Sequence, residues 1–381
     1  MPHRSTLIYS CIQAFFWMAW AALLGFSSTY LLSSGLTSFD TGLLMGFCSL
    51  LSAVFQPVLA GFIDRKGFFL LKPVIILLSA LSAVLCGILP FLALSPLVTG
   101  ILFSTAAGLL QLSSPLLNTL ASTVEGTDFG IARGIGSLGY AIIFYIIGWL
   151  CDIWSHQTVV LAAAISFTGV ILTTAAFRSS HSAETGNQPS SQGSFPARYR
   201  SFMITLAGVL LLYISHVYLG NYGYQIVLSK SGNSVNFGTG GTLAAIAELP
   251  VMFLFGSLLK KKPASFWVRI TGFSFFLKAA VIFLSVRITG YYAAMAFQLT
   301  GWGMIQVASV YYVNEVIPAE DAAKGQSMFT SALALATVFG SFTGGWLIDT
   351  FSVRVLVMTA VCFAAAGALI VFFSMKGRTS A

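Results

Sequence analysis

Charge is scarce in this sequence. Only 8% of its 381 residues are Asp, Glu, Lys or Arg, whereas 57% are hydrophobic. A typical soluble domain has about one quarter charged residues, because its surface must be hydrated. The composition therefore excludes a water-soluble globule and predicts an integral membrane protein surrounded by the lipid bilayer.

Motifs of catalysis and of cofactor binding are also missing. The sequence has no HExxH, no Ser-containing GxSxG, no nucleotide-binding glycine loop and no His or Cys set at metal-ligand spacing. The five cysteines lie in or near apolar runs without paired spacing, at Cys11, Cys48, Cys86, Cys151 and Cys362. We therefore expect that the protein is not an enzyme and that it uses neither a metal nor a cofactor.

A series of apolar runs fills the chain. About 20 apolar residues suffice to cross a bilayer as a helix. Twelve such spans are predicted, at residues 7–32, 39–63, 68–93, 95–121, 131–153, 157–177, 201–228, 237–259, 265–286, 290–314, 325–350 and 353–375. The first has no small-residue cleavage site before Ser33, so we interpret it as a span and not as a removed signal peptide. The predicted fold class is all-α and membrane-spanning.

The basic residues indicate topology and do not indicate nucleic-acid binding, although the net charge is +8. If the spans alternate in direction, one side of the membrane holds Arg4, Arg65, Lys66, Lys72, Arg178, Arg198, Arg200, Lys260, Lys261, Lys262, Arg269, Lys324, Lys376 and Arg378. The other side holds only Lys230, Arg287 and Arg354. By the positive-inside rule, both termini of this multi-pass protein of the cell membrane are cytoplasmic.

The chain divides into two similar halves. A polar stretch separates the spans six and six, which predicts an N-terminal bundle at 1–177, a cytoplasmic linker at 178–200 and a C-terminal bundle at 201–381. The sequence GWLCD at 148–152 recurs as GWLID at 345–349. Duplicated six-helix bundles are typical of secondary transporters that rock one half against the other. Such a pathway is enclosed within one chain, so we expect a functional monomer.

Three charged residues lie inside predicted spans: Arg133, Glu248 and Lys278. An ionised side chain at the bilayer centre costs about 2.5 to 3.5 kcal/mol on insertion scales. We therefore expect all three to face a polar cavity or each other and to mark a transport path. Two alternatives remain: Arg133 could snorkel to the nearby membrane surface, and Glu248 could form a purely structural ion pair.

A short loop narrows the class of transporter to which the chain is compared. The segment GFIDRKG at 61–67 resembles the loop that recurs between spans 2 and 3 of the major facilitator superfamily. There, Gly61 would permit close helix approach, and Asp64 would accept from a helix N-terminus or a basic group. The alternative for this loop is an ordinary solvated charged turn. The corresponding segment at 256–262 lacks the acid. The predicted cytoplasmic gate motif consists of Gly61, Asp64, Arg65 and Gly67.

Further segments resemble the lactose permease-like branch of oligosaccharide:proton symporters. They are Asp40-Thr41-Gly42, Phe55-Gln56-Pro57, Gly130-Ile131-Ala132-Arg133 with Gly136, Gly139 and Tyr140, and Glu248-Leu249. The resemblance implies that Arg133 hydrogen-bonds sugar hydroxyls through its planar fork and that Tyr140 stacks on the sugar ring. It also implies that Glu248 joins substrate recognition to protonation, and that Lys278 replaces an arginine that helps to release the proton.

Departures from the branch are equally informative. Asn118 occupies the place of a carboxylate, Gln298 lies in a segment that lacks the family's His and Glu, and Leu333 replaces a lysine. Glu248 is thus the one carboxylate well inside a span, and we predict that it couples protons together with Lys278. The predicted substrate-binding residues are Arg133, Tyr140, Asn118, Glu248, Gln298 and Trp17. His216 could line the cavity or bond to a neighbouring helix, and Trp17 could serve packing alone.

The function predicted from these patterns is proton-coupled symport of a sugar, an oligosaccharide or a similar polar solute by alternating access. The implied partners are that small-molecule solute and H⁺. The alternative is a carrier of nucleosides, aromatic acids or drugs, by uptake or efflux, because the fold does not fix the substrate. A passive pore is disfavoured, since it needs neither duplicated halves nor a gate motif.

Overall fold

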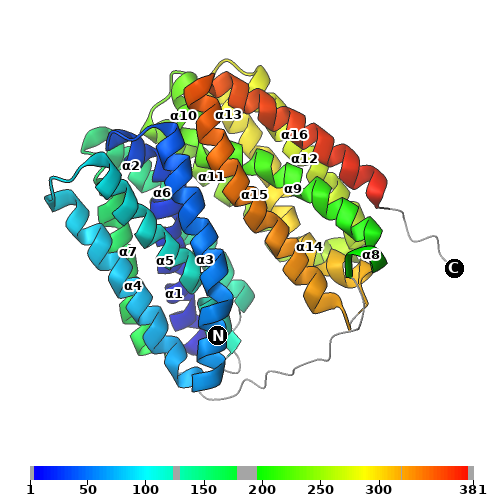
Figure 1. Cartoon of the computed structure of the whole chain (residues 1–381), viewed down its shortest axis with the longest axis horizontal. Coiled ribbons are helices and arrows are strands. Elements are labelled where there is room, and N and C mark those ends of the chain that lie inside the picture. Colours follow the sequence, from blue (N-terminus) through cyan, green and yellow to red (C-terminus); the bar gives the residue numbers. More distant parts are fainter. Residues whose placement is uncertain (1–3, 123–128, 178–194, 319, 376–381) are drawn as a thin grey trace. The chain divides into compact units, whose positions relative to one another are not determined.

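A computed structural model describes residues 4–122, 129–177, 195–318 and 320–375, and this part of the chain consists of helices, turns and loops without a strand (Figure 1). Its first ten elements are α1 (Arg4–Trp20), η1 (Ala21–Gly25), α2 (Ser27–Ser33), α3 (Ser38–Lys66), η2 (Phe68–Leu70), α4 (Leu71–Ile88), η3 (Leu89–Phe91), α5 (Pro96–Ser122), α6 (Phe129–Ile153) and α7 (Thr158–Ala176). Residues 178–194 of the predicted linker lie outside the described residues.

Eleven further elements follow that gap. They are α8 (Phe195–Arg198), α9 (Arg200–Asn221), α10 (Gly223–Ser229), α11 (Ser234–Leu259), α12 (Ala264–Leu284), α13 (Ile288–Met295), η4 (Ala296–Gln298), η5 (Leu299–Gly303), α14 (Met304–Val316), α15 (Ala322–Thr350) and α16 (Val353–Ser374).

Ten helices of the described part are long and apolar enough to cross a membrane. The two remaining predicted spans also have helical counterparts. The 237–259 span lies within the continuous helix α11, and the 290–314 span is divided into α13, η4, η5 and α14. All twelve predicted spans therefore correspond to helical segments, and several of them are interrupted, among them 7–32, 201–228 and 290–314.

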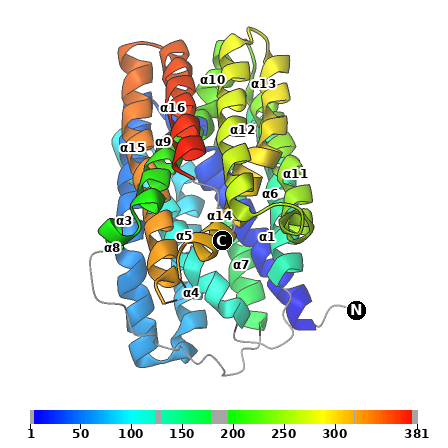
Figure 2. The ribbon, with the colours of Figure 1, turned by 90° about the vertical axis from the view of Figure 1, so that its right-hand side faces the viewer.

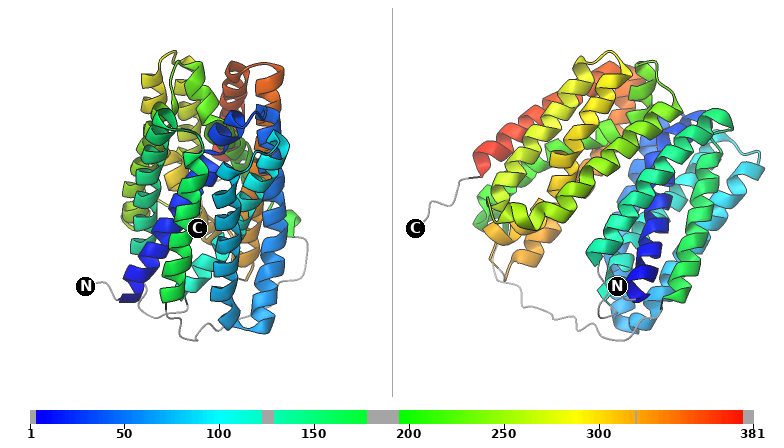
Figure 3. Two further views of the ribbon diagram at one scale, coloured as in Figure 1. Left: turned by 90° about the vertical axis from the view of Figure 1, so that its left-hand side faces the viewer. Right: turned by 180° about the vertical axis from the view of Figure 1, so that it is seen from behind.

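By internal packing, the chain forms two compact units. The first unit comprises residues 1–185 and 232–246, and the second comprises 186–231 and 247–381, so α11 begins in the first and ends in the second. In the first unit α1 packs on α6 and α7, and α4 packs on α5 and α7 (Figure 3). In the second unit α9 packs on α15 and α16, and α12 packs on α14 and α16 (Figure 2).

Small residues permit close helix contacts in each unit. A Cβ atom on Gly136 would lie 3.2 Å from the Gln13 carbonyl oxygen, and one on Gly139 would lie 3.1 Å from that of Ala14. The backbones of α1 and α6 are therefore nearly in contact, as expected for helices that associate in lipid. A Cβ atom on Gly208 of α9 would likewise lie 3.0 Å from the Gly367 oxygen of α16.

Helix ends are fixed by side chains. Thr37 and Asp40 form a capping box that begins α3. Three basic side chains donate to carbonyl oxygens at helix C-termini, where the helix dipole is negative. Lys72 donates to Phe177 at the end of α7, Lys230 donates to Ile282 over 2.9 Å at the end of α12, and Arg269 donates to Met375 after α16. These cations thus stabilise helix ends in addition to any role in topology.

Candidate functional site

In the first unit, Arg133 of α6 lies over an aromatic ring of α1. Its guanidinium carbon is 3.8 Å from the centroid of the Trp17 ring, and its Nη1 donates to the Ser137 hydroxyl over 2.8 Å. A cation over a tryptophan face is stabilised by about 0.5 to 2 kcal/mol, depending on desolvation. The structure therefore brings together two of the predicted substrate-binding residues, and Arg133 remains half-buried.

A chain of hydrogen bonds fixes the Trp17 ring. The indole Nε1 donates to the Gln13 side-chain oxygen over 2.9 Å, and the Gln13 amide nitrogen donates to the Tyr9 hydroxyl over 2.6 Å. Tyr9 in turn donates to the Leu117 carbonyl oxygen of α5 over 2.9 Å. Gln13 and Tyr9 are buried. The ring beneath Arg133 is thus held in one orientation from two helices.

The other two predicted residues of this unit are Tyr140 and Asn118. Tyr140 stacks on Phe144, with ring centroids 5.2 Å apart and planes inclined by 29°. Phe144 continues into an aromatic cluster with Phe26 and Phe237. Asn118 is exposed on α5, and no hydrogen bond joins it to the residues that the structure describes. The structure therefore does not place Asn118 as a partner of Arg133.

In the second unit, three predicted residues form one hydrogen-bonded chain. Lys278 of α12 donates to the Gln298 side-chain oxygen over 2.5 Å, and the Gln298 amide nitrogen donates to the Glu248 carboxylate over 2.9 Å. Lys278 and Gln298 are only 5% and 6% exposed. The amide therefore separates the two charges, offering its acceptor to the cation and its donors to the anion.

Irregular backbone places this amide. Gln298 ends the 3₁₀ turn η4 and is followed by the π-helical turn η5, which carries Gly301 and Gly303. A Cβ atom on Gly303 would lie 3.2 Å from both the Cα and the Cγ of Glu248, so a side chain there would require Glu248 to move by a few tenths of an ångström. Such π-helical turns are frequent at functional sites.

Sequence reasoning missed most of an aromatic cluster beside this chain of hydrogen bonds. Tyr213 and His216 are one turn apart on α9, with ring centroids 5.4 Å apart. The Trp302 ring of η5 stacks on both, 5.1 Å from Tyr213 and 4.8 Å from His216. His216 also meets Phe275 edge-on at 5.4 Å, one turn before Lys278 on α12. The three stacked rings are half-buried within spans, where polar groups usually face a cavity.

The structure describes the backbone of the predicted gate motif. A Cβ atom on Gly61 would meet nothing within 4 Å among the described residues. Gly67 ends α3 with a φ of 114°, and its N–H donates to the Ile63 carbonyl oxygen over 2.8 Å. The second glycine of the motif thus serves as a helix cap. Arg65 is exposed, and the Asp64 side chain lies outside the described residues.

A tight helix crossing is a further feature that the sequence did not indicate. A Cβ atom on Gly148 of α6 would lie 2.6 Å from the Ser234 oxygen of α11, and one on Gly238 would lie 2.9 Å from the Phe144 oxygen. The Asp152 carboxylate accepts from the Ser234 N–H over 3.1 Å, which satisfies the first turn of α11. The beginning of α11 is therefore held on α6 within the first unit.

Comparison with known proteins adds the family. The model of the MFS_1 like family matches residues 7–359. A crystal structure of the nucleoside transporter NupG in a mutant form has a TM-score of 0.79 and 14% identity, covering 97% of this chain and 98% of that one. A second NupG structure has a TM-score of 0.75 and 15% identity, covering 98% of each chain. No curated protein matches the sequence.

These findings define a multi-pass membrane transporter with the major facilitator fold. The chain belongs to the MFS_1 like family. The predicted superfamily and the predicted all-α, membrane-spanning fold class are thereby confirmed.

Proposed function

We propose that this protein is a secondary active transporter that couples the movement of a small polar solute to protons by alternating access. The observation that carries the proposal is the chain from Lys278 through Gln298 to Glu248. The Glu248 carboxylate bonds to an amide, and a buried cation lies beyond that amide. Binding of one proton to the carboxylate would change the net charge of this chain of residues by one unit. Glu248 is therefore the proposed proton carrier, and Lys278 is the proposed counter-charge.

For the solute, Arg133 offers a planar fork of donors beside an oriented indole ring. Two parallel N–H groups suit two neighbouring hydroxyls, and the ring suits the apolar face of a sugar. The first proposed substrate class is accordingly a sugar, an oligosaccharide or a similar polyhydroxylated solute.

A specific observation favours a second class, the nucleosides. Tyr213, His216 and Trp302 provide flat aromatic surfaces close to the hydrogen-bonded chain of Glu248, and a nucleobase stacks on such surfaces. The structural likeness to the nucleoside transporter NupG supports the same alternative.

Uptake into proteoliposomes tests the proposal. With an imposed gradient, acidic outside, we expect uphill accumulation of a labelled sugar or nucleoside that a protonophore abolishes. Empty liposomes and liposomes at equal pH are the controls. Equilibration without accumulation would indicate a pore, and accumulation that ignores the proton gradient would contradict proton coupling.

We further propose a functional monomer in the cell membrane with both termini in the cytoplasm. The proposal rests on the excess of basic residues on one side of the alternating spans and on the two bundles carried by a single chain. Protease cleavage of terminal tags in sealed vesicles of known orientation would test the topology.

A further inference from the structure

A cavity of about 340 Å³ lies in the second unit, and none of the residues assigned to transport lines it. It lies where α8 meets α9, where α12 begins and where α14 ends. Its walls include Arg198, Arg200, Ser201, Ser265, Tyr312 and Glu315. The predicted topology puts this end of the helices on the cytoplasmic side, at the level of the lipid headgroups.

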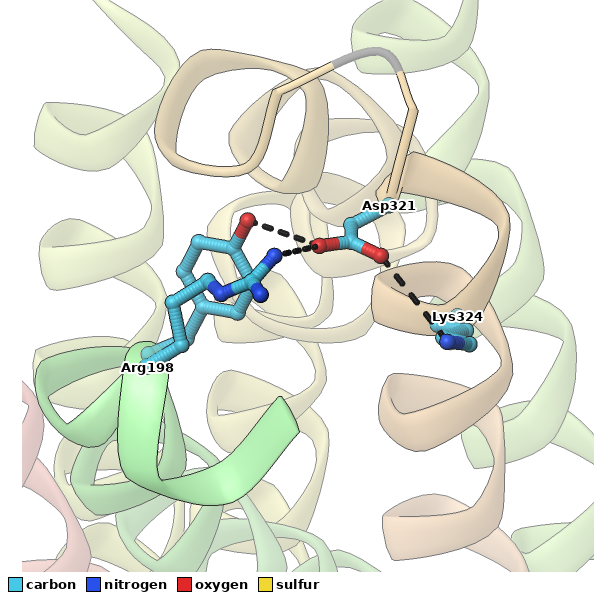
Figure 4. A network of polar contacts seen from close by, with 4 residues as sticks. Arg198, Asp321 and Lys324 are labelled. Carbon is cyan, nitrogen blue, oxygen red and sulfur yellow. Dashed lines mark hydrogen bonds and ion pairs between the residues drawn. The ribbon is translucent and has the colours of Figure 1, made fainter. Parts of the chain in front are cut away.

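Two arginines make the wall basic. Arg198 forms an ion pair with Asp321 over 3.1 Å, and the Tyr199 hydroxyl donates to the same carboxylate over 2.9 Å (Figure 4). Asp321 is only 2% exposed and also forms an ion pair with Lys324 over 3.9 Å. Its carboxylate is therefore paired with Arg198 and Lys324. Arg200 is exposed and has no hydrogen bond or ion pair with any residue that the structure describes.

A third arginine lies behind the wall. Arg269, one turn beyond Ser265 on α12, donates to the carbonyl oxygen of Met375, which itself lines the cavity. Its buried Nε has no acceptor among the described residues. A buried N–H without an acceptor is costly. Arg269 does not line the cavity, but its guanidinium adds positive charge behind the wall.

The acidic residue of the cavity wall, Glu315, already accepts hydrogen bonds from the protein. Both carboxylate oxygens of Glu315 accept from Ser265, one from its hydroxyl over 2.7 Å and one from its N–H over 3.3 Å, and so cap the start of α12. At Arg200 the helix α9 begins, and its first backbone bond runs from Met203 to Tyr199 over 3.0 Å. The preceding N–H groups lie at the positive end of the helix dipole, which favours anions.

We propose that this cavity binds a phosphate group, supplied either by an anionic phospholipid headgroup or by a soluble phosphate. Its volume falls in the usual range of small-ligand sites. Basic pockets between transmembrane helices on the cytoplasmic side are known to take anionic headgroups. Because the ligand would contact the start of α9, it would stabilise the helix that carries Tyr213 and His216. The site is separate from the proposed transport residues.

Ligand binding to the purified full chain in detergent tests this. Calorimetry measures the binding of three ligands: dioctanoyl phosphatidylglycerol, dioctanoyl phosphatidylcholine and inorganic phosphate. Each ligand is titrated into the native chain and into the variants Arg200→Gln and Lys261→Gln. Lys261 is exposed at the same end but does not line the cavity. We expect phosphatidylglycerol to bind saturably, about tenfold more weakly to Arg200→Gln and unchanged to Lys261→Gln. Arg200→Lys should bind at an intermediate level, because it keeps the charge and loses the fork.

The outcomes separate the ligand sources. Binding of phosphatidylglycerol without binding of inorganic phosphate assigns a lipid headgroup, whereas saturable phosphate binding that Arg200→Gln weakens assigns a soluble ligand. Equal binding of phosphatidylcholine and phosphatidylglycerol, or equal losses in Arg200→Gln and Lys261→Gln, would overturn the proposal. Arg200 forms no hydrogen bond or ion pair with the described residues, so the melting temperature of unliganded Arg200→Gln should equal that of the native chain.

Discussion

At the scale of single residues, uncharged amides organise both groups of predicted site residues. Gln13 orients the ring beneath Arg133, and Gln298 separates Lys278 from Glu248. The sequence predicted Glu248, Lys278 and Gln298 as members of the site, because each is polar within an apolar span. It could not predict the order of the hydrogen bonds, which depends on the 3₁₀ and π-helical turns that follow α13.

Replacing the amide tests its role. In Gln298→Leu, Glu248 loses a donor and the buried Lys278 loses its acceptor. We expect a loss of about 1 to 3 kcal/mol in unfolding free energy together with a loss of proton-driven uptake. Thermal melting and proteoliposome uptake provide the measurements. Gln306→Leu is the matched control, since Gln306 is exposed on α14, and equal behaviour of the two variants would contradict the account.

The arginine of the first unit gives a second residue-scale prediction. Arg133→Lys retains the charge, but it loses the planar group that lies over Trp17. We expect substrate affinity to fall about tenfold, the equivalent of 1.4 kcal/mol, with little change in maximal uptake rate. The dependence of initial uptake on substrate concentration measures this. Ser137→Ala, which removes only the neighbouring acceptor, should have a smaller effect, and an unchanged affinity in Arg133→Lys would exclude direct recognition.

At the scale of elements, the crossing of α6 and α11 is the tightest contact that the sequence did not indicate. Gly148 was noted as part of a repeated segment, but Gly238 lies in another span, and no local pattern pairs the two. The aromatic cluster of Tyr213, His216 and Trp302 was not predicted for the same reason, because Trp302 lies in the turn η5 and stacks on residues of α9. Pairings between distant helices depend on tertiary packing, which apolar periodicity does not encode.

The crossing itself can be tested with a single methyl group. In Gly148→Ala, the added carbon would lie 2.6 Å from the Ser234 oxygen, so α11 must shift. We expect a destabilisation of about 1 to 3 kcal/mol and a lower melting temperature. Gly220→Ala on α9 is the control, because a Cβ atom there meets nothing within 4 Å. If both variants melt at the native temperature, the contact between Gly148 and Ser234 is not tight enough to exclude a methyl group.

At the scale of the whole molecule, the length and spacing of the apolar runs were sufficient to predict the fold class. The domain boundaries and the roles of Gly61 and Asn118 remain predictions. The roles of Gly61 and Asn118 were assigned by resemblance to other chains, whereas the contacts of a side chain depend on its own neighbours. Gly67 illustrates this, because its positive φ explains the glycine without any reference to gating.

The central claim is that one titrating carboxylate, Glu248, couples protons to solute movement in this transporter. Glu248→Gln preserves size and hydrogen bonding to Gln298, but it cannot change its charge. The decisive measurement compares proton-driven accumulation with exchange of labelled for unlabelled solute in the same proteoliposomes. The account predicts that Glu248→Gln abolishes accumulation while exchange continues, and uphill accumulation at the native level in that variant would contradict it.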